Sequence, residues 1–259
     1  MITFAVYRSS IREVIHLSMR IVKNTITEIQ IELLDPNHDT DQENSSDNLL
    51  LWNYSLKGTE EELTPLFSGS IWSAIVWKDS VNVMCEYLES HREEFRNKTI
   101  IELGCGLGVP GLVAGITCQA KQVYLTDRAQ DLQVLSQSLT QNLPLRSLKF
   151  ECLAFDWKDY GDDSFGKIQA EVVLAVECIS ADVYGKESLF HLLQAIKTVA
   201  KKETPILVFI CSRRRKSDGL DFVLEKIEKC LMENSCIQLV AKSDEDGIEL
   251  YKIPLFYYS

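Results

Sequence analysis

Short apolar runs alternate with helical segments along the chain from residue 99 onward. Five runs have the length and apolar content of buried strands: TIIELG (99–104), QVYLTD (122–127), LKFECLAFDW (148–157), AEVVLAVE (170–177) and PILVFICS (205–212). Amphipathic helical segments follow the first, second, fourth and fifth of these runs. This alternation predicts a doubly wound, Rossmann-like α/β fold, in which helices cover both faces of a mainly parallel sheet.

The two ends of the chain depart from this alternation. At the C-terminal end, CIQLVAK (236–242) and IELYKIP (248–254) flank a DEDG turn, which predicts a terminal hairpin with at least one antiparallel strand. Residues 1–35 contain two β-branched runs, the acidic stretch 35–48 predicts a loop, and residues 49–68 look irregular. We therefore expect a small β-rich extension over 1–68. A second domain over 69–259 would begin with an amphipathic helix in the 70–91 segment.

Charge and cysteine usage exclude several classes of protein. With 38 Asp and Glu against 27 Lys and Arg, the net charge of −11 disfavours binding to nucleic acid. The 8 cysteines form no C-x-x-C pair, so no metal site is expected, and free thiols in apolar runs suggest a reducing compartment. The N-terminus lacks the apolar core of a secretory signal, and residues 99–117 contain Glu102 and glycines that do not suit a membrane span.

A glycine cluster follows the first predicted strand of the α/β region. Gly104, Gly106 and Gly108 have the spacing G-x-G-x-G, whereas the dinucleotide pattern G-x-G-x-x-G would require glycine where Val109 stands. Glu102 would repel a diphosphate and attract a cation. The alternative is a tight strand-to-helix turn that binds no ligand. Three alternating glycines and the neighbouring acid favour a ligand with positive charge and no diphosphate.

Asp127 ends the second strand, about twenty residues beyond the glycines. An acid at this position can accept hydrogen bonds from both hydroxyls of a ribose, or it can cap the helix that follows. Together with the glycine loop it favours ribose binding. A ribose acceptor without a diphosphate cradle indicates S-adenosylmethionine, whose sulfonium and ammonium groups are attracted by acids.

These motifs resemble a known family. ELGCGLGVPGL, VYLTD, FDW and a fourth strand that ends in an acid are similar to the seven-β-strand methyltransferases, and in particular to the protein-lysine methyltransferases of family sixteen. Gly69-Ser70-Ile71-Trp72 fits the G-x-x-W segment that precedes the glycine loop in that group. The resemblance spans roughly residues 66–254. It implies a seven-stranded sheet of order 3-2-1-4-5-7-6, which the terminal hairpin completes.

The resemblance also implies the residues that bind the cofactor. Glu102, Gly104 and Gly106 would line its methionine end, and Asp127 would hold the ribose. The adenine would lie by Asp156 and Trp157, with the acid near the exocyclic amine. The pocket would be completed from other parts of the chain by Trp72 and Ala175. For both tryptophans, the alternative is ordinary core packing.

The end of the fourth strand is where the chain departs from the family. The family places a D-x-x-Y motif there, facing the transferred methyl group, but this chain reads Glu177-Cys178-Ile179-Ser180. The acid is kept and the tyrosine is lost. Asp182 and Tyr184 follow, either within reach of the site or in a surface turn that ends at Gly185. The candidate catalytic residues are Glu177, Ser180 and Tyr184, with Glu177 expected to orient the substrate amine rather than to act as a strong base.

A basic run, Arg213 to Lys216, follows the fifth strand. It is either a solvated loop or a surface that docks an acidic partner. The resulting hypothesis is a monomeric methyltransferase of the cytoplasm, with the nucleus as a second compartment, that uses S-adenosylmethionine to methylate a lysine of a protein. The alternatives are a small-molecule methyltransferase, a binding protein with a degenerate site, and, least favoured, a nicotinamide-dependent oxidoreductase.

Overall fold

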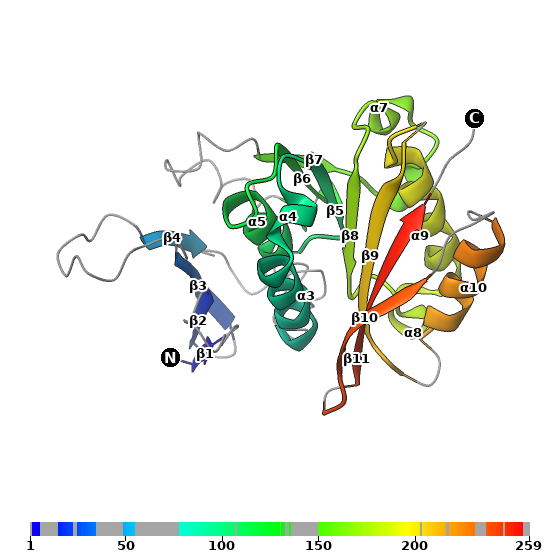
Figure 1. Cartoon of the computed structure of the whole chain (residues 1–259). Coiled ribbons are helices and arrows are strands. Elements are labelled where there is room, and N and C mark those ends of the chain that lie inside the picture. Colours follow the sequence, from blue (N-terminus) through cyan, green and yellow to red (C-terminus); the bar gives the residue numbers. More distant parts are fainter. Residues whose placement is uncertain are drawn as a thin grey trace.

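Two β-sheets and a set of helices make up the computed structural model of the chain (Figure 1). The structure describes these residues: 2–5, 15–22, 25–34, 49–54, 78–106, 108–129, 131, 132, 135, 150–202, 204–215, 218–230, 237–245 and 247–255. Trp72 and the acidic stretch 35–48 lie outside them, as does most of the helix expected after Asp127. The boundary near residue 69 also falls outside the described residues, so the division into two domains stays a prediction.

The first sheet is built from the N-terminal residues alone. Its four strands are antiparallel and follow the order of the chain: β1 (Ile2–Ala5), β2 (Ile15–Val22), β3 (Thr25–Leu34) and β4 (Leu49–Tyr54). The two β-branched runs therefore form strands as expected. The prediction of irregular structure from residue 49 is wrong for 49–54, where LLLWNY pairs with β3. Such a short run without polar alternation carries little strand signal by itself.

The second sheet has the expected seven strands. They are β5 (Thr99–Leu103), β6 (Gln122–Asp127), β7 (Phe150–Ala154), β8 (Val172–Val176), β9 (Ile206–Arg213), β10 (Gln238–Ser243) and β11 (Ile248–Leu255). Their order, β10-β11-β9-β8-β5-β6-β7, confirms the predicted 3-2-1-4-5-7-6 arrangement. The first five strands are parallel, and the terminal hairpin adds β11 antiparallel to β9 and β10 antiparallel to β11.

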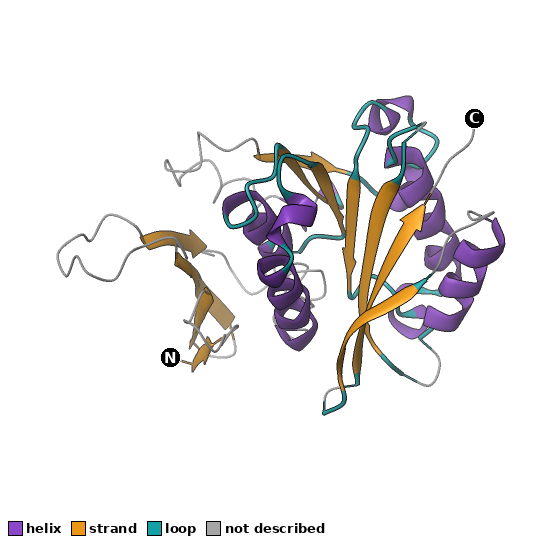
Figure 2. Ribbon diagram, in the orientation of Figure 1, coloured by secondary structure: helices purple, strands orange, loops and turns teal. Residues whose placement is uncertain are grey.

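Helices cover both faces of this sheet (Figure 2). On one face lie α3 (Lys78–Ser90) and α5 (Val109–Ile116), with the short α4 (Arg92–Phe95) after α3. On the other lie α9 (Lys186–Val199) and α10 (Leu220–Cys230), with the short η2 (Trp157–Asp159), α7 (Asp163–Gly166) and α8 (Ala181–Tyr184). Alternate residues of each strand pack on opposite faces, so Ile100 and Ile101 belong to different clusters of buried side chains.

This architecture fixes where a site can form. The parallel strands β5, β6 and β8 end at the same edge of the sheet, at Leu103, Asp127 and Val176 respectively. Ligands of open α/β sheets bind at this carboxyl edge. Five of the six cysteines that the structure describes as free thiols are buried, as expected for cysteines in apolar runs. Among the described helices, none is long and apolar enough to cross a membrane.

Candidate active site

The glycine loop joins the end of β5 to the start of α5. Gly104, Gly106 and Gly108 have φ angles of +64°, +53° and +69°, a region that residues with side chains rarely adopt. Gly108 is the N-cap of α5, and Pro110 lies in the first turn of that helix, where its missing N–H costs nothing. The spacing of the glycines is therefore required by the backbone itself, and the loop keeps its N–H groups close to the edge of the sheet.

Asp127 holds this loop in place. Its carboxylate is only 6% exposed and accepts two backbone hydrogen bonds, from the N–H of Gly106 at 2.9 Å and from that of Arg128 at 2.9 Å. Burial raises the pKa of Asp127 to about 6, although both N–H donors act to lower it. Each carboxylate oxygen has a second lone-pair direction. The group can therefore bind the loop and still accept hydrogen bonds from ligand hydroxyls.

Glu102, on β5, forms a hydrogen bond to the first turn of α5. Its side chain is 2% exposed, and its Oε2 accepts a hydrogen bond of 2.8 Å from the N–H of Gly111 in the first turn of α5. Burial raises the pKa of Glu102 to about 8, against the lowering effect of the Gly111 N–H, and the charge of Asp127 adds to the rise. Glu102 thus supports the helix that follows the loop, while its predicted role at the methionine end of the cofactor stays a prediction.

The raised pKa of Glu102 predicts a pH-dependent stability. An unfolded glutamate has a pKa of about 4.3, so between about pH 4.3 and pH 8 the unfolded chain releases a proton that the folded protein keeps. The free energy of unfolding therefore falls as the pH rises through this window. Glu102→Gln stays neutral and keeps an acceptor for Gly111, so it should gain stability relative to the wild type on going from pH 5 to pH 8.5, by about 4 kcal/mol. Urea unfolding at both pH values measures this gain, and an unchanged difference between the two proteins would contradict it.

Asp156 and Trp157 follow β7, and their role beside the adenine stays a prediction. Asp156 is the N-cap of η2, and its Oδ1 accepts a hydrogen bond of 3.1 Å from the N–H of Lys158. The indole of Trp157 is half-buried, and its Cζ2 lies 3.1 Å from the position that a Cβ on Gly104 would occupy. Ala175, on β8, is buried on the same face of the sheet as the cluster against which Trp157 packs. The structure therefore brings Trp157 to the glycine loop, as predicted for two parts of one pocket.

Glu177 follows β8, and its carboxylate forms hydrogen bonds and an ion pair with other residues of the chain. Its φ of +53° lies in the left-handed region, and the residue is 6% exposed. Its Oε1 accepts hydrogen bonds from the hydroxyl of Ser80 and, at 2.8 Å, from the backbone N–H of Arg213. Its Oε2 forms an ion pair of 3.0 Å with the guanidinium of Arg215. Three donors already occupy this carboxylate, so its predicted hydrogen bond to a substrate amine would be a fourth.

The other candidate catalytic residues differ in exposure. Ser180 is 3% exposed and is the N-cap of α8, without a side-chain capping bond. Tyr184 is 42% exposed at the end of α8, and Gly185 follows it with a φ of +82°. Residues 181–184 form a helical turn rather than the surface turn that was one alternative. Of Asp182, the structure describes only the backbone within this helix.

The basic run is not a solvated loop. Arg213 is the last residue of β9, and the guanidinium of Arg214 pairs with Glu249 at 2.5 Å and with Asp221 at 2.6 Å. Arg215 pairs with Glu177, while Lys216 lies outside the described residues. The interpretation as solvated cations is therefore wrong for Arg214 and Arg215, because both neutralise carboxylates of their own chain. Sequence spacing gave no indication of these partners, which come from α10, β11 and the end of β8.

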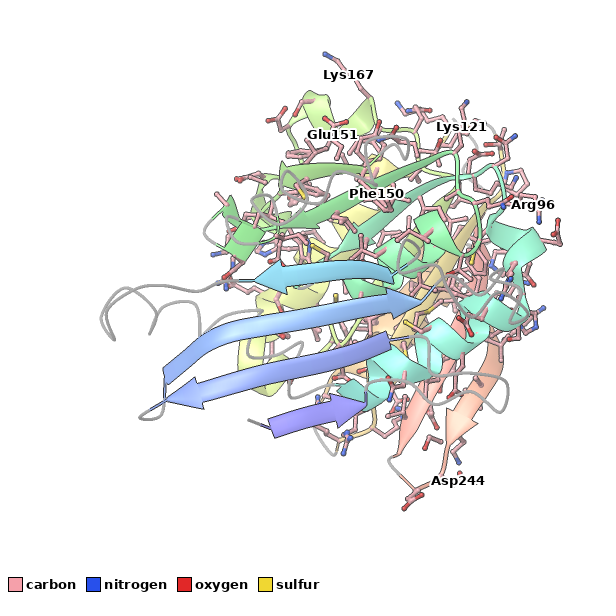
Figure 3. All side chains as sticks on the ribbon, turned by 90° about the vertical axis from the view of Figure 1, so that its left-hand side faces the viewer. Arg96, Lys121, Phe150, Glu151, Lys167 and Asp244 are labelled. Atoms are coloured by element: carbon pink, nitrogen blue, oxygen red, sulfur yellow. The ribbon has the colours of Figure 1, made fainter. Side chains whose placement is uncertain are left out.

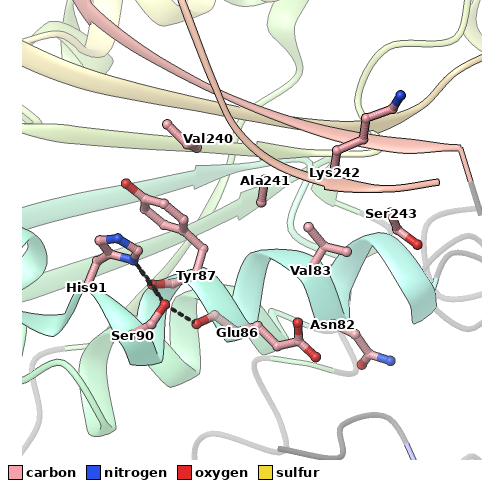
Figure 4. A pocket seen from close by; sticks show the side chains of 10 residues that line it. All are labelled: Asn82, Val83, Glu86, Tyr87, Ser90, His91, Val240, Ala241, Lys242 and Ser243. Carbon is pink, nitrogen blue, oxygen red and sulfur yellow. Dashed lines mark hydrogen bonds between the residues drawn. The ribbon is translucent and has the colours of Figure 1, made fainter.

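A separate cavity of about 500 Å³ lies between α3 and β10 (Figure 4). Its walls include Glu86, Tyr87 and His91 on one side and Val240 and Lys242 on the other. The imidazole of His91 stacks on the ring of Tyr87 at a centroid distance of 4.0 Å. None of the residues predicted to bind the cofactor lines this cavity, so it is distinct from the site at the carboxyl edge of the sheet.

The site at the carboxyl edge fits S-adenosylmethionine in its chemistry. The buried carboxylate of Asp127 is placed to accept hydrogen bonds from ribose hydroxyls, and Trp157 offers an aromatic face next to Gly104. A side chain on Gly104 would come within 3.1 Å of both Trp157 and the sulfur of Cys178, so a glycine keeps this space open. The charge of the Asp127 carboxylate would repel a diphosphate, so this edge of the sheet suits a sulfonium and an ammonium better. Fold and site together define a methyltransferase that uses S-adenosylmethionine.

Comparison with known proteins identifies the family. Residues 59–230 match the family described as lysine methyltransferase, and the chain belongs to this family. It is a protein-lysine methyltransferase that depends on S-adenosylmethionine. This assignment confirms the resemblance seen in ELGCGLGVPGL and in the acid that follows β8.

Several named proteins are similar to this chain. EEF1A lysine methyltransferase 3 of Mus musculus is 34% identical over 197 residues, which cover 75% of this chain and 78% of that protein. The protein of the same name from Xenopus tropicalis is 25% identical over 201 residues, covering 77% and 83%. Protein N-lysine methyltransferase METTL21A of Xenopus tropicalis is 32% identical over 153 residues, covering 58% of this chain and 65% of that protein. A solved SAM-dependent methyltransferase from Aquifex aeolicus covers 66% of this chain and 88% of its own, with a TM-score of 0.44 and 14% identity.

Proposed function

We propose that this methyltransferase acts as a monomer on a lysine side chain of a cytoplasmic protein, with the nucleus as a second compartment. The observation that carries the proposal is the buried Asp127 carboxylate, which is hydrogen-bonded to Gly106 of the glycine loop at the carboxyl edge of the sheet. Lysine is the expected methyl acceptor because the chain belongs to the lysine methyltransferase family. The buried free thiols support a reducing compartment. Because two similar proteins are named for EEF1A, that protein is the first candidate substrate to test.

Methyl transfer to lysine requires that the protein bind the cofactor, admit the lysine amine and bind that amine without its proton. S-adenosylmethionine, when bound, supplies a methyl group on a positively charged sulfur. The glycine loop and Asp127 would hold the amino-acid end and the ribose of this cofactor at the carboxyl edge of the sheet. The segment after β8 must admit a lysine amine and exclude water. The amine must also have lost its proton, although a free lysine has a pKa of about 10.4.

Two alternatives predict different products. A small-molecule methyltransferase would share the cofactor residues but would leave its methyl groups in metabolites. A degenerate binding protein would bind the cofactor without turnover, and Ser180 in place of the family's tyrosine is its main support. Ser180 is buried. Because serine has no ring, the position lacks the aromatic wall that the family motif would place there.

The test is a labelling experiment with the full chain. We expect that S-adenosylmethionine labelled in its methyl group transfers label to protein in a methyl-deficient cell lysate, and that acid hydrolysis recovers the label as methyl-lysine. Purified EEF1A forms a second arm, and the Asp127→Ala variant is the negative control. Label found only in small molecules would contradict a protein substrate. Cofactor binding with no label in any fraction would favour the binding protein.

A further inference from the structure

Glu177 is held in an unfavourable backbone conformation by contacts from two other parts of the chain. Its φ of +53° lies in the left-handed region, which is unfavourable for a residue with a side chain, so other contacts must hold it. Its N–H donates to the carbonyl of Cys211 at 2.8 Å, and its carboxylate accepts from Ser80, in the first turn of α3. The segment after β8 is thereby joined to β9 and to α3. Strain of this kind is common at functional sites.

Arg215 completes this arrangement. Its guanidinium is 24% exposed and lies 3.0 Å from Oε2 of Glu177, whose side chain is 5% exposed. Its backbone N–H donates to Asp218 at 2.8 Å, and the carbonyl of Asp218 accepts a bond of 2.9 Å from the N–H of Ala181. The two segments that follow β8 and β9 are therefore bound to each other at both ends. An ion pair this buried is costly to break from one side, because the remaining charge has no partner.

The segment that contains Glu177 lies beside the glycine loop. Cys178, the next residue after Glu177, donates from its sulfur to the carbonyl of Leu103 at 2.9 Å. The same sulfur is 3.1 Å from the position of a Cβ on Gly104. Glu177 therefore directly precedes a residue that contacts the glycine loop, at the carboxyl edge of the sheet where the methyl acceptor must enter.

Other groups around Glu177 include two thiols, a hydroxyl and the backbone of a second arginine. Burial raises the pKa of the Cys178 and Cys211 thiols well above the usual range, and the charge of Glu177 raises it further, so both thiols stay neutral. Ser80 from α3 is uncharged, and Arg213 contributes a backbone N–H. Asp218 faces the backbone of Arg215. Within the described residues, the counter-charge with a resolved contact to the Glu177 carboxylate is the guanidinium of Arg215.

These contacts bear on the protonation of the acceptor. An unbalanced carboxylate at this edge would stabilise an ammonium ion, and a protonated amine has no lone pair for the methyl group. We propose that Arg215 is a positioning residue that fixes Glu177 and cancels its charge, so that the lysine amine reaches the methyl group uncharged. This inference rests on the proposed function and adds to it a residue that acts through Glu177 without touching the substrate.

A pair of cofactor analogues tests the proposal without a known protein substrate. In sinefungin, a carbon that bears an ammonium group replaces the sulfur and its methyl group, whereas S-adenosylhomocysteine has a neutral sulfur without the methyl group. The ratio of their affinities, measured by calorimetry at pH 7.5, therefore reports the electrostatic potential at the position of the methyl group. Arg215→Gln removes the charge but keeps an amide that can donate to Glu177. We expect it to shift the ratio about tenfold in favour of sinefungin, with little change for S-adenosylhomocysteine.

Three further variants make the result specific to charge. Arg215→Lys should keep the ratio of the wild type, and the double variant Glu177→Gln with Arg215→Gln should return to it, because neither leaves a carboxylate unbalanced. Glu177→Gln alone should shift the ratio about tenfold against sinefungin. It is the deciding variant if Arg215→Gln does not fold in a thermal melt.

The outcomes separate the two proposals. A ratio within twofold of the wild type in Arg215→Gln, or in Glu177→Gln if that variant decides, would overturn the inference while leaving the function intact. If the wild type bound neither analogue, the proposed function would fail and the inference with it. A merely structural role for the pair would lower both affinities together and leave their ratio unchanged, which also counts against the proposal.

Discussion

Replacing Asp127 with alanine should weaken the binding of S-adenosylhomocysteine by about a hundredfold or more. The substitution removes the acceptor for the ribose hydroxyls, and a hydrogen bond to a charged group contributes about 1.5 to 3 kcal/mol. It also removes the acceptor that holds the Gly106 N–H at 2.9 Å, so the glycine loop loses its anchor on β6. Calorimetric titration of the purified variant measures the loss directly.

Two variants and a pH series make this result specific. Asp127→Asn keeps one acceptor oxygen and should lose about tenfold. Asp244→Ala, at the tip of the β10–β11 hairpin (Figure 3), removes an aspartate far from the loop and should bind like the wild type. Because burial raises the pKa of Asp127 to about 6, the affinity of the wild type should fall as the pH drops below about 6, while that of Asp127→Asn should not. Normal binding by Asp127→Ala would remove this residue from the cofactor site.

The sequence predicts the centre of the seven-stranded sheet well because its central strands are buried on both faces. The runs predicted at 99–104, 122–127 and 205–212 agree with β5, β6 and β9 to within one residue at either end. Continuous apolar runs bounded by polar turns are typical of parallel strands. The predicted run at 148–157 is too long, since β7 ends at Ala154 and Asp156 caps η2 instead. An apolar pattern does not show where a strand stops and a short helical turn begins.

The cofactor half of the site could be predicted because its parts are local in sequence. Gly104 to Gly108 and Asp127 sit directly after strands, where topology alone brings them together. The acceptor half could not be predicted in the same way. Glu177 meets Ser80 from 97 residues earlier and Arg215 from 38 residues later. No spacing rule connects such positions, and an arginine in a basic run looks the same whether it is solvated or paired.

Gly111 is a position where adding a single methyl group should destabilise the fold by about 3 kcal/mol. In an exposed helix, alanine in place of glycine usually stabilises by about 0.5 to 1 kcal/mol. Here a Cβ would lie 2.4 Å from Cδ2 of Leu125 and 2.7 Å from Oε2 of Glu102. Leu125 is fully buried on β6, and Glu102 already accepts the Gly111 N–H, so neither can move without separating α5 from the sheet. Gly111→Ala should therefore unfold at a lower urea concentration, with an unchanged slope of the transition.

Two other glycines show that the effect depends on the neighbours. A Cβ on Gly115, in the same helix, would lie 2.3 Å from the ring of Phe150, but that side chain is half-buried at the first residue of the edge strand β7 and can turn away. Gly115→Ala should cost less than Gly111→Ala. Gly161 has open space around it, so Gly161→Ala should change stability by less than about 0.5 kcal/mol. Equal stability for Gly111→Ala and Gly161→Ala would mean that α5 can move off β6, and that Glu102 does not fix the helix to the sheet.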